Sequence, residues 1–116
     1  MKDENIIEQK SKVFAIRIIK LYRQLCFDNK EYVLSKQLLR SGTSIGANVK
    51  EAIRGQSRAD FISKMSIALK ESAETEYWLE LLHETEYISG ESFESIYTDC
   101  NEISRILMSI VKTAKK

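Results

Sequence analysis

Apolar residues recur at steps of three and four in four successive segments of this chain. Side chains with that spacing lie on one face of an α-helix, whereas a strand would alternate apolar and polar residues, and no segment does so. The segments cover about residues 5–27, 31–54, 57–87 and 90–114. Because the chain contains no proline, each segment can continue as an uninterrupted helix. The sequence therefore predicts an all-α protein.

The fourth segment carries the most regular apolar stripe and indicates how the helices pack. From Phe93 to Ala114 its apolar positions alternate in steps of three and four without a break. Such a narrow seam is typical of helices that pack nearly parallel or antiparallel. Short connections between the segments favour antiparallel neighbours. We predict one domain, residues 1–116, that folds as an up-down-up-down antiparallel four-helix bundle.

Glycines and a serine are expected to shape the second and third helices. Gly42 and Gly46 each cost about 1 kcal/mol relative to alanine inside a helix, which predicts a weak or kinked second helix. Gly55 is expected to close that helix in the left-handed conformation. Ser57 is a good N-cap for the third helix.

The third segment has two further features. Three small residues in the middle of its stripe, Ala68, Ser72 and Thr75, predict a close approach of another helix at that level. Tyr77 and Trp78 are adjacent and cannot both point into one narrow seam, so one of them should lie on a second packing surface. Because aromatic residues are enriched at interfaces, this favours a homo-oligomer.

Charge is unevenly distributed along the chain, although its formal net charge is only +1. Residues 30–70 contain eight Lys or Arg against three Asp or Glu, whereas residues 71–102 contain ten acidic residues and no basic one. The acidic residues stack at four-residue steps, as at Glu76 and Glu80, which is unfavourable in an isolated helix. We expect the basic second helix of the same or a neighbouring subunit to offset them; a solvated acidic face is the alternative.

Basic residues of the second segment are spaced so that several share one helix face. A row of this kind can contact successive phosphates of a nucleic acid. It can also be a solvated face, or pair with acidic residues elsewhere. The candidate nucleic-acid or partner-binding residues are Lys36, Arg40, Lys50, Arg54 and Arg58.

Residues that could carry chemistry are few. The spacing of Glu80 and His83 matches the Glu-x-x-His pattern of di-iron bundles, but the chain has no second histidine. Cys26 and Cys100 are not spaced as zinc ligands, and there is no glycine-rich phosphate loop. We therefore predict no catalytic residue, no metal and no cofactor. Because the sequence has no membrane-spanning run and no secretion signal, we expect a cytoplasmic protein that does not contact membranes.

The stretch from Gln37 to Ala52, QLLRSGTSIGANVKEA, resembles the signature of the four helix bundle family, also called the 23S rRNA intervening-sequence protein family. The later stretch from Asp60 to Glu76 is similar to the second block of that family. Three positions depart from the pattern: Gly46 replaces a proline, Ala52 replaces a glycine, and Glu71 replaces a glycine.

The resemblance implies a bacterial bundle that assembles as a ring, typically a homopentamer. Members of the family are encoded within intervening sequences of ribosomal RNA genes or elsewhere in bacterial genomes. The related accessory proteins of diversity-generating retroelements are basic pentamers that bind nucleic acid and a reverse transcriptase, a strongly basic character that this chain lacks. By position in the motif, the candidate structural or subunit-interface residues are Ser44, Gly46, Asn48 and Glu51. We expect Asn48 and Glu51 to satisfy backbone groups at the Gly46 weak point, or to bridge subunits.

These observations favour a non-enzymatic, oligomeric helical scaffold that binds RNA or a ribonucleoprotein through the basic face of the second helix. The alternative is a protein-interaction module without nucleic-acid contact. An enzyme or metal protein that uses Glu80 and His83 is the least favoured of the three.

Overall fold

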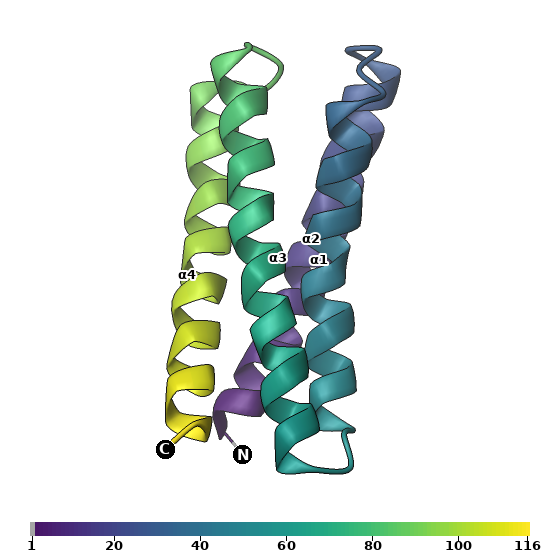
Figure 1. Cartoon of the computed structure of the whole chain (residues 1–116). Helices are drawn as coiled ribbons and strands as arrows, with labels where there is room; N and C mark the ends of the chain where they lie inside the picture. Colours follow the sequence, from purple (N-terminus) through teal and green to yellow (C-terminus); the bar gives the residue numbers. More distant parts are fainter. Residues whose placement is uncertain (1) are drawn as a thin grey trace.

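The computed structural model describes residues 2–116, and every regular element in that range is a helix. The helices are α1 (Lys2–Phe27), α2 (Leu34–Ile53), α3 (Arg58–Glu84) and α4 (Gly90–Ala114). They form a bundle 44 Å long, in which the loops α1–α2 and α3–α4 lie at one end (Figure 1). The loop α2–α3 and both chain termini lie at the other end. This is the up-down-up-down four-helix bundle that the sequence predicts.

Helices that follow one another in the chain also pack against one another, and α4 returns to α1. The packing is closest between α2 and α3 and sparsest between α1 and α4. The bundle therefore has one loosely closed side, where α1 and α4 are held partly by charged side chains across the gap. One such contact is the ion pair between Arg17 and Asp99, at 2.6 Å.

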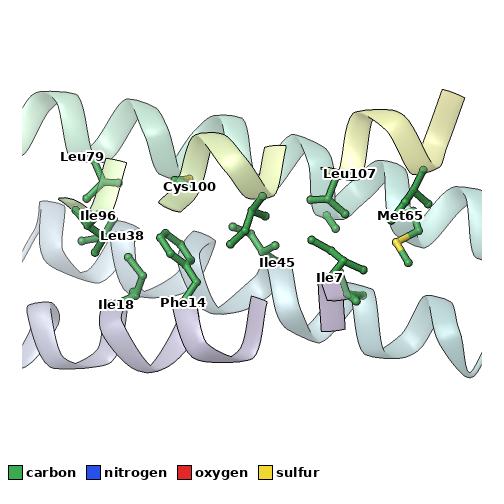
Figure 2. Packing of buried hydrophobic residues seen from close by; sticks show 14 of the residues in the cluster. Ile7, Phe14, Ile18, Leu38, Ile45, Met65, Leu79, Ile96, Cys100 and Leu107 are labelled. Carbon is green, nitrogen blue, oxygen red and sulfur yellow. The ribbon is translucent and has the colours of Figure 1, made fainter. Parts of the chain in front are cut away.

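The core consists of the predicted apolar stripes, and all four helices contribute to it (Figure 2). Phe14 and Ile18 come from α1, Ile45 from α2, Leu79 from α3 and Leu107 from α4, and each is at most 1% exposed. The helical periodicity of the sequence thus identifies the buried face of every helix.

Small and polar residues bring α2 and α3 together in the middle of the bundle. Ala68, Ser72 and Thr75 of α3 are completely buried. The Thr75 hydroxyl donates a hydrogen bond of 2.9 Å to Ser41 of α2, whereas the Ser72 hydroxyl accepts one of 2.8 Å from Ser104 of α4. A larger side chain at these positions would separate the two helices. The predicted close approach is confirmed.

The glycines of α2 do not interrupt the helix, which is continuous from Leu34 to Ile53. The predicted local weakness or kink at these glycines stays a prediction. A Cβ atom on Gly42 would lie 2.8 Å from Cγ1 of Ile18, whereas one on Gly46 would lie 3.4 Å from the carbonyl oxygen of Ser11. Gly42 serves close packing against α1, and this packing outweighs the low helix propensity of glycine.

A buried glutamate determines where α2 begins. The carboxylate of Glu31 accepts hydrogen bonds from the backbone N–H groups of Val33, Leu34 and Ser35, at 3.2, 3.0 and 2.7 Å. These are free donors of the first helical turn. The helix therefore starts at Leu34 and not at residue 31, because Glu31 caps it from outside; Lys30 before it adopts a left-handed conformation with φ 57°.

The turn between α2 and α3 also differs from the prediction. Gly55 does not have a positive φ. A Cβ atom on it would lie 2.5 Å from the Asp60 carboxylate and 3.1 Å from the carbonyl oxygen of Ala52, so glycine is required there for space. Ser57 is the N-cap of α3 as predicted, since its hydroxyl accepts the backbone N–H of Asp60 at 3.0 Å.

Two remaining helix ends shift by a few residues from their predicted positions. The third helix ends at Glu84 instead of near Tyr87, because Glu86 takes up a left-handed conformation with φ 69°. The first helix begins earlier than predicted, at Lys2. Ser89 caps α4 by accepting the backbone N–H of Ser92 at 3.1 Å.

Candidate nucleic-acid interface

The basic residues of α2 follow the outer side of the helix from one end of the bundle toward the other. Lys36 lies in the first turn, and Lys50 and Arg54 lie at the last turn. Arg58 opens α3 directly after the loop. All four side chains are exposed, and within residues 2–116 none of them forms an ion pair. Arg58 lines a groove with Asp3 and Glu4 of α1 and with the C-terminal end of α4, so the structure does not bring it together with the cations of α2. We call Lys36, Lys50 and Arg54 the basic face.

Arg40 is the exception among the predicted basic residues. Its guanidinium forms ion pairs with Glu71, at 3.6 Å, and with Glu74, both on α3. Glu74 also accepts a hydrogen bond of 3.0 Å from the indole N–H of Trp78. The Trp78 hydrogen bond, together with that of Arg40, lowers the pKa of the Glu74 carboxyl despite its partial burial. The charge of Arg40 is therefore largely balanced within the subunit.

Lys12 is a basic residue beside this face that the sequence analysis missed. With Lys50 it lines a groove of about 270 Å³ between α1 and α2, to which Glu8 and Gly46 also contribute. The two lysines are 38 positions apart in the chain, so their proximity depends on the register of α1 against α2. The tight packing of Gly42 against Ile18 helps to fix that register, and no sequence spacing reveals it.

The motif residues of α2 mostly bind their own helix. The Ser44 hydroxyl donates to the carbonyl oxygen of Arg40 at 2.6 Å, and the Asn48 amide donates to that of Ser44 at 2.9 Å. Glu51 instead forms an ion pair of 3.2 Å with Lys64 of α3. Within the subunit, the motif therefore supports α2 and its junction with α3. Bridging of subunits by these residues stays a prediction.

The acidic tract of residues 71–102 is balanced in part within the subunit. Arg40 of α2 pairs with two of its members, as the sequence analysis expects. Helix α1 supplies two more cations, since Arg17 pairs with Asp99, and Lys10 pairs with Glu102 at 3.2 Å. Hydroxyl groups bind two further members: Ser104 donates to Glu76 at 2.9 Å, and Tyr97 donates to Glu80. The remaining carboxylates gather around the α3–α4 turn: Glu84, Glu86, Glu91 and Glu94.

His83 and Glu80 are both engaged in contacts inside the bundle. The His83 ring stacks on Phe93, with ring centres 4.4 Å apart, and Phe93 in turn stacks on Tyr97. The hydrogen bond to Glu80 raises the pKa of the Tyr97 hydroxyl to about 12. Over residues 2–116, no three His, Cys, Asp or Glu side chains are grouped so that they could hold a metal ion.

Tyr77 and Trp78 differ in burial as expected from their adjacency, although their ring centres lie only 5.3 Å apart. Trp78 is half-buried and packs against the core, whereas Tyr77 is 53% exposed. An aromatic side chain of α3 thus lies on the outer surface, and its contact with a second subunit stays a prediction.

Fold and surface together define an all-helical bundle with a solvent-exposed basic face and a partly neutralised acidic hairpin. Within the described residues, none of its helices has an apolar stretch long enough to cross a membrane. The chain belongs to the 23S rRNA-intervening sequence protein family, whose sequence profile matches residues 3–109.

A solved structure supports this assignment. The chain is similar to a protein with unknown function from the S23 ribosomal protein family of Bacteroides thetaiotaomicron, with 59% sequence identity and a TM-score of 0.93. The match covers 95% of this chain and 98% of the other. No curated protein matches the sequence.

Proposed function

We propose that this protein is a non-enzymatic, oligomeric helical scaffold of the cytoplasm that binds RNA or a ribonucleoprotein through the basic face of α2. The observation that carries the proposal is that Lys36, Lys50 and Arg54 are exposed and form no ion pair within residues 2–116, although the chain as a whole is nearly neutral. Unpaired cations on a rigid helix are free to bind phosphates and release counterions. The family membership is consistent with an RNA partner.

The dimensions of α2 suit a short stretch of nucleic acid. Lys36 and Arg54 are 18 residues apart, which corresponds to about 27 Å along a helix. At about 3.4 Å per stacked nucleotide, this length corresponds to roughly eight nucleotides of one strand. Lys12 and Lys50 lie beside the same path, at the groove between α1 and α2.

Charge reversal tests the proposed RNA contact. Arg54→Glu should weaken binding of the purified protein to a structured RNA with an exposed loop, measured by fluorescence anisotropy. Arg105→Glu makes the same charge change on an exposed position of α4 and serves as the matched control. Arg40→Ala should weaken binding less than Arg54→Ala, because Glu71 and Glu74 already balance Arg40. Equal effects of Arg54→Glu and Arg105→Glu would contradict a defined basic face.

Exposed apolar side chains on α1 support the oligomeric part of the proposal. Val13 is 55% and Ile16 is 46% exposed. Val13 also lines a groove of about 460 Å³ between α1 and α4, together with Ile6 and Ile103. Contiguous apolar surface of this kind is typical of protein contacts. The groove equally favours the second candidate, a protein-interaction module that makes no contact with nucleic acid.

The mass of the protein in solution, together with its RNA affinity, distinguishes these two candidate functions. A ring like that expected from the family should have the mass of five chains by light scattering. The double variant Val13→Asp, Ile16→Asp should dissociate it while keeping its helical circular dichroism, because both positions are exposed. A wild-type monomer would refute the oligomer, and an oligomer without RNA affinity would favour the protein-interaction module.

A further inference from the structure

The loop between α1 and α2 presents large apolar side chains at one end of the bundle. Phe27 is 73%, Tyr32 is 55% and Val33 is 72% exposed. The loop that joins the two helices lies at the end of the bundle opposite the chain termini (Figure 1). Phe27 is the last residue of α1 and Tyr32 belongs to the loop. Two aromatic rings so close to one turn make an unusual surface, because side chains of this size are normally buried.

This loop is held in a defined shape by hydrogen bonds, so the rings are displayed on a rigid support. Besides its three backbone contacts to the start of α2, Glu31 donates its own N–H to the carbonyl oxygen of Leu25 at 3.0 Å. The Ser35 hydroxyl donates to the carbonyl oxygen of Glu31 at 2.7 Å. Rigid support lowers the entropy cost of binding a partner there.

Three cations lie close in the sequence to the exposed rings. Arg23 lies one helical turn before Phe27, Lys30 lies within the loop, and Lys36 lies one turn after Tyr32; all three are exposed. Asp28 is the exposed acid of the loop, whereas the Glu31 carboxylate is buried against backbone N–H groups. The loop itself therefore combines aromatic faces with a surplus of positive charge. The exposed carboxylates at this end of the bundle belong to the separate α3–α4 turn: Glu84, Glu86, Glu91 and Glu94.

We infer that this loop, with Phe27, Tyr32, Arg23, Lys30 and Lys36, binds unpaired nucleotides of RNA by stacking bases on the two rings and contacting phosphates with the cations. Aromatic rings bracketed by cations suit single-stranded nucleic acid, in which splayed bases stack on side chains. A protein partner with an apolar surface would gain little binding free energy from contact with the three cations. The inference rests on the proposed function and adds a second contact, because Lys36 joins the loop to the basic face of α2.

The test compares aromatic with merely apolar replacements. An eight-nucleotide single-stranded RNA carrying one 2-aminopurine is titrated with wild type, Phe27→Leu, Phe27→Trp and Tyr32→Ala. Phe27→Leu and Tyr32→Ala should each weaken binding by about 5- to 150-fold. Phe27→Trp should preserve binding, since it keeps an aromatic face. Stacking should quench 2-aminopurine fluorescence in wild type, and Phe27→Leu should remove the quenching.

Tyr87→Ala is the matched control, because Tyr87 is also an exposed tyrosine but lies in the α3–α4 turn and not in the α1–α2 loop. It should leave RNA affinity unchanged. If Arg54→Glu abolishes binding while Phe27→Leu and Tyr32→Ala leave it unchanged, the inference about the loop is wrong and the proposed function stands. If wild type does not bind RNA, both are wrong. If the loop variants instead change the oligomer mass without changing RNA affinity, the loop is a protein contact and the inference is overturned.

Discussion

Replacing Gly42 by alanine should destabilise the protein, although alanine is the better helix former. The new Cβ atom would lie 2.8 and 2.9 Å from the two γ-carbons of Ile18, a completely buried residue of α1. Forcing an extra methyl group into such a site costs about 1 to 3 kcal/mol. The gain in helix propensity offsets about 1 kcal/mol of this cost. The net effect should be a loss of up to about 2 kcal/mol in the free energy of unfolding.

Gly46→Ala is the control that isolates the packing contribution. It makes the same change one turn further along α2, where the nearest atom, the carbonyl oxygen of Ser11, would be 3.4 Å from the new Cβ. Gly46→Ala should therefore be stabilising by up to about 1 kcal/mol. The propensity gain is common to both variants, so the difference between them, about 1 to 3 kcal/mol, measures the contact with Ile18.

Urea denaturation followed by circular dichroism measures both variants, at one fixed protein concentration because association adds to apparent stability. In an Ile18→Ala background, Gly42→Ala should no longer be destabilising, since both γ-carbons are gone. Equal changes for Gly42→Ala and Gly46→Ala would refute the reasoning, because they would mean that α1 and α2 do not meet at Gly42.

Three further predictions concern caps and thiols. Burial raises the pKa of Glu31, but the backbone N–H groups of Leu34, Ser35 and Val33 outweigh burial and lower the pKa overall. The difference in the free energy of unfolding between wild type and Glu31→Gln should therefore be complete above about pH 4.3, the ordinary pKa of glutamate, and should shrink as the pH falls through the lowered pKa. A difference that grew in acid would contradict this. Ser57→Ala should lower the free energy of unfolding by about 1 kcal/mol through loss of the α3 N-cap, whereas Ser57→Asp should not, as urea denaturation can measure. Burial, together with the nearby charges of Glu76 and Asp99, raises the pKa of the Cys100 thiol. A thiol reagent at pH 8 should therefore modify the half-buried Cys26 in the folded protein and should reach Cys100 only after denaturation. A Cys26→Ser variant that still reacts quickly when folded would disprove this.

The fold could be predicted from the sequence because the buried face of each helix carries apolar residues at helical spacing. Seven successive positions of the α4 stripe, from Phe93 to Ala114, lie in or against the core. The periodicity within one helix does not show which of its residues contact a particular residue of another helix. Gly42 resembles a defect in the sequence, and it becomes a packing requirement only when Ile18 is known to lie opposite.

Helix ends and the functional surface were less predictable for a similar reason. Glutamate is common inside helices, yet the carboxylate of Glu31 caps α2 from outside. The start of α2 predicted from the sequence pattern is therefore three residues too early. For the basic face, spacing correctly groups residues along α2 but cannot distinguish Arg40, which α3 neutralises, from Lys50, which stays free. Lys12 lies beside the basic face only because of the register in which α1 packs against α2, and that register cannot be read from the spacing of residues within one helix.

The salt dependence of RNA binding tests the central claim most directly. If Lys12, Lys36, Lys50 and Arg54 each neutralise one phosphate of a single strand, the logarithm of the association constant should fall with the logarithm of salt concentration with a slope of about −2.8. Lys50→Ala should make that slope less steep by about 0.7. A slope near zero, or one that Lys50→Ala leaves unchanged, would contradict RNA recognition by the basic face of α2.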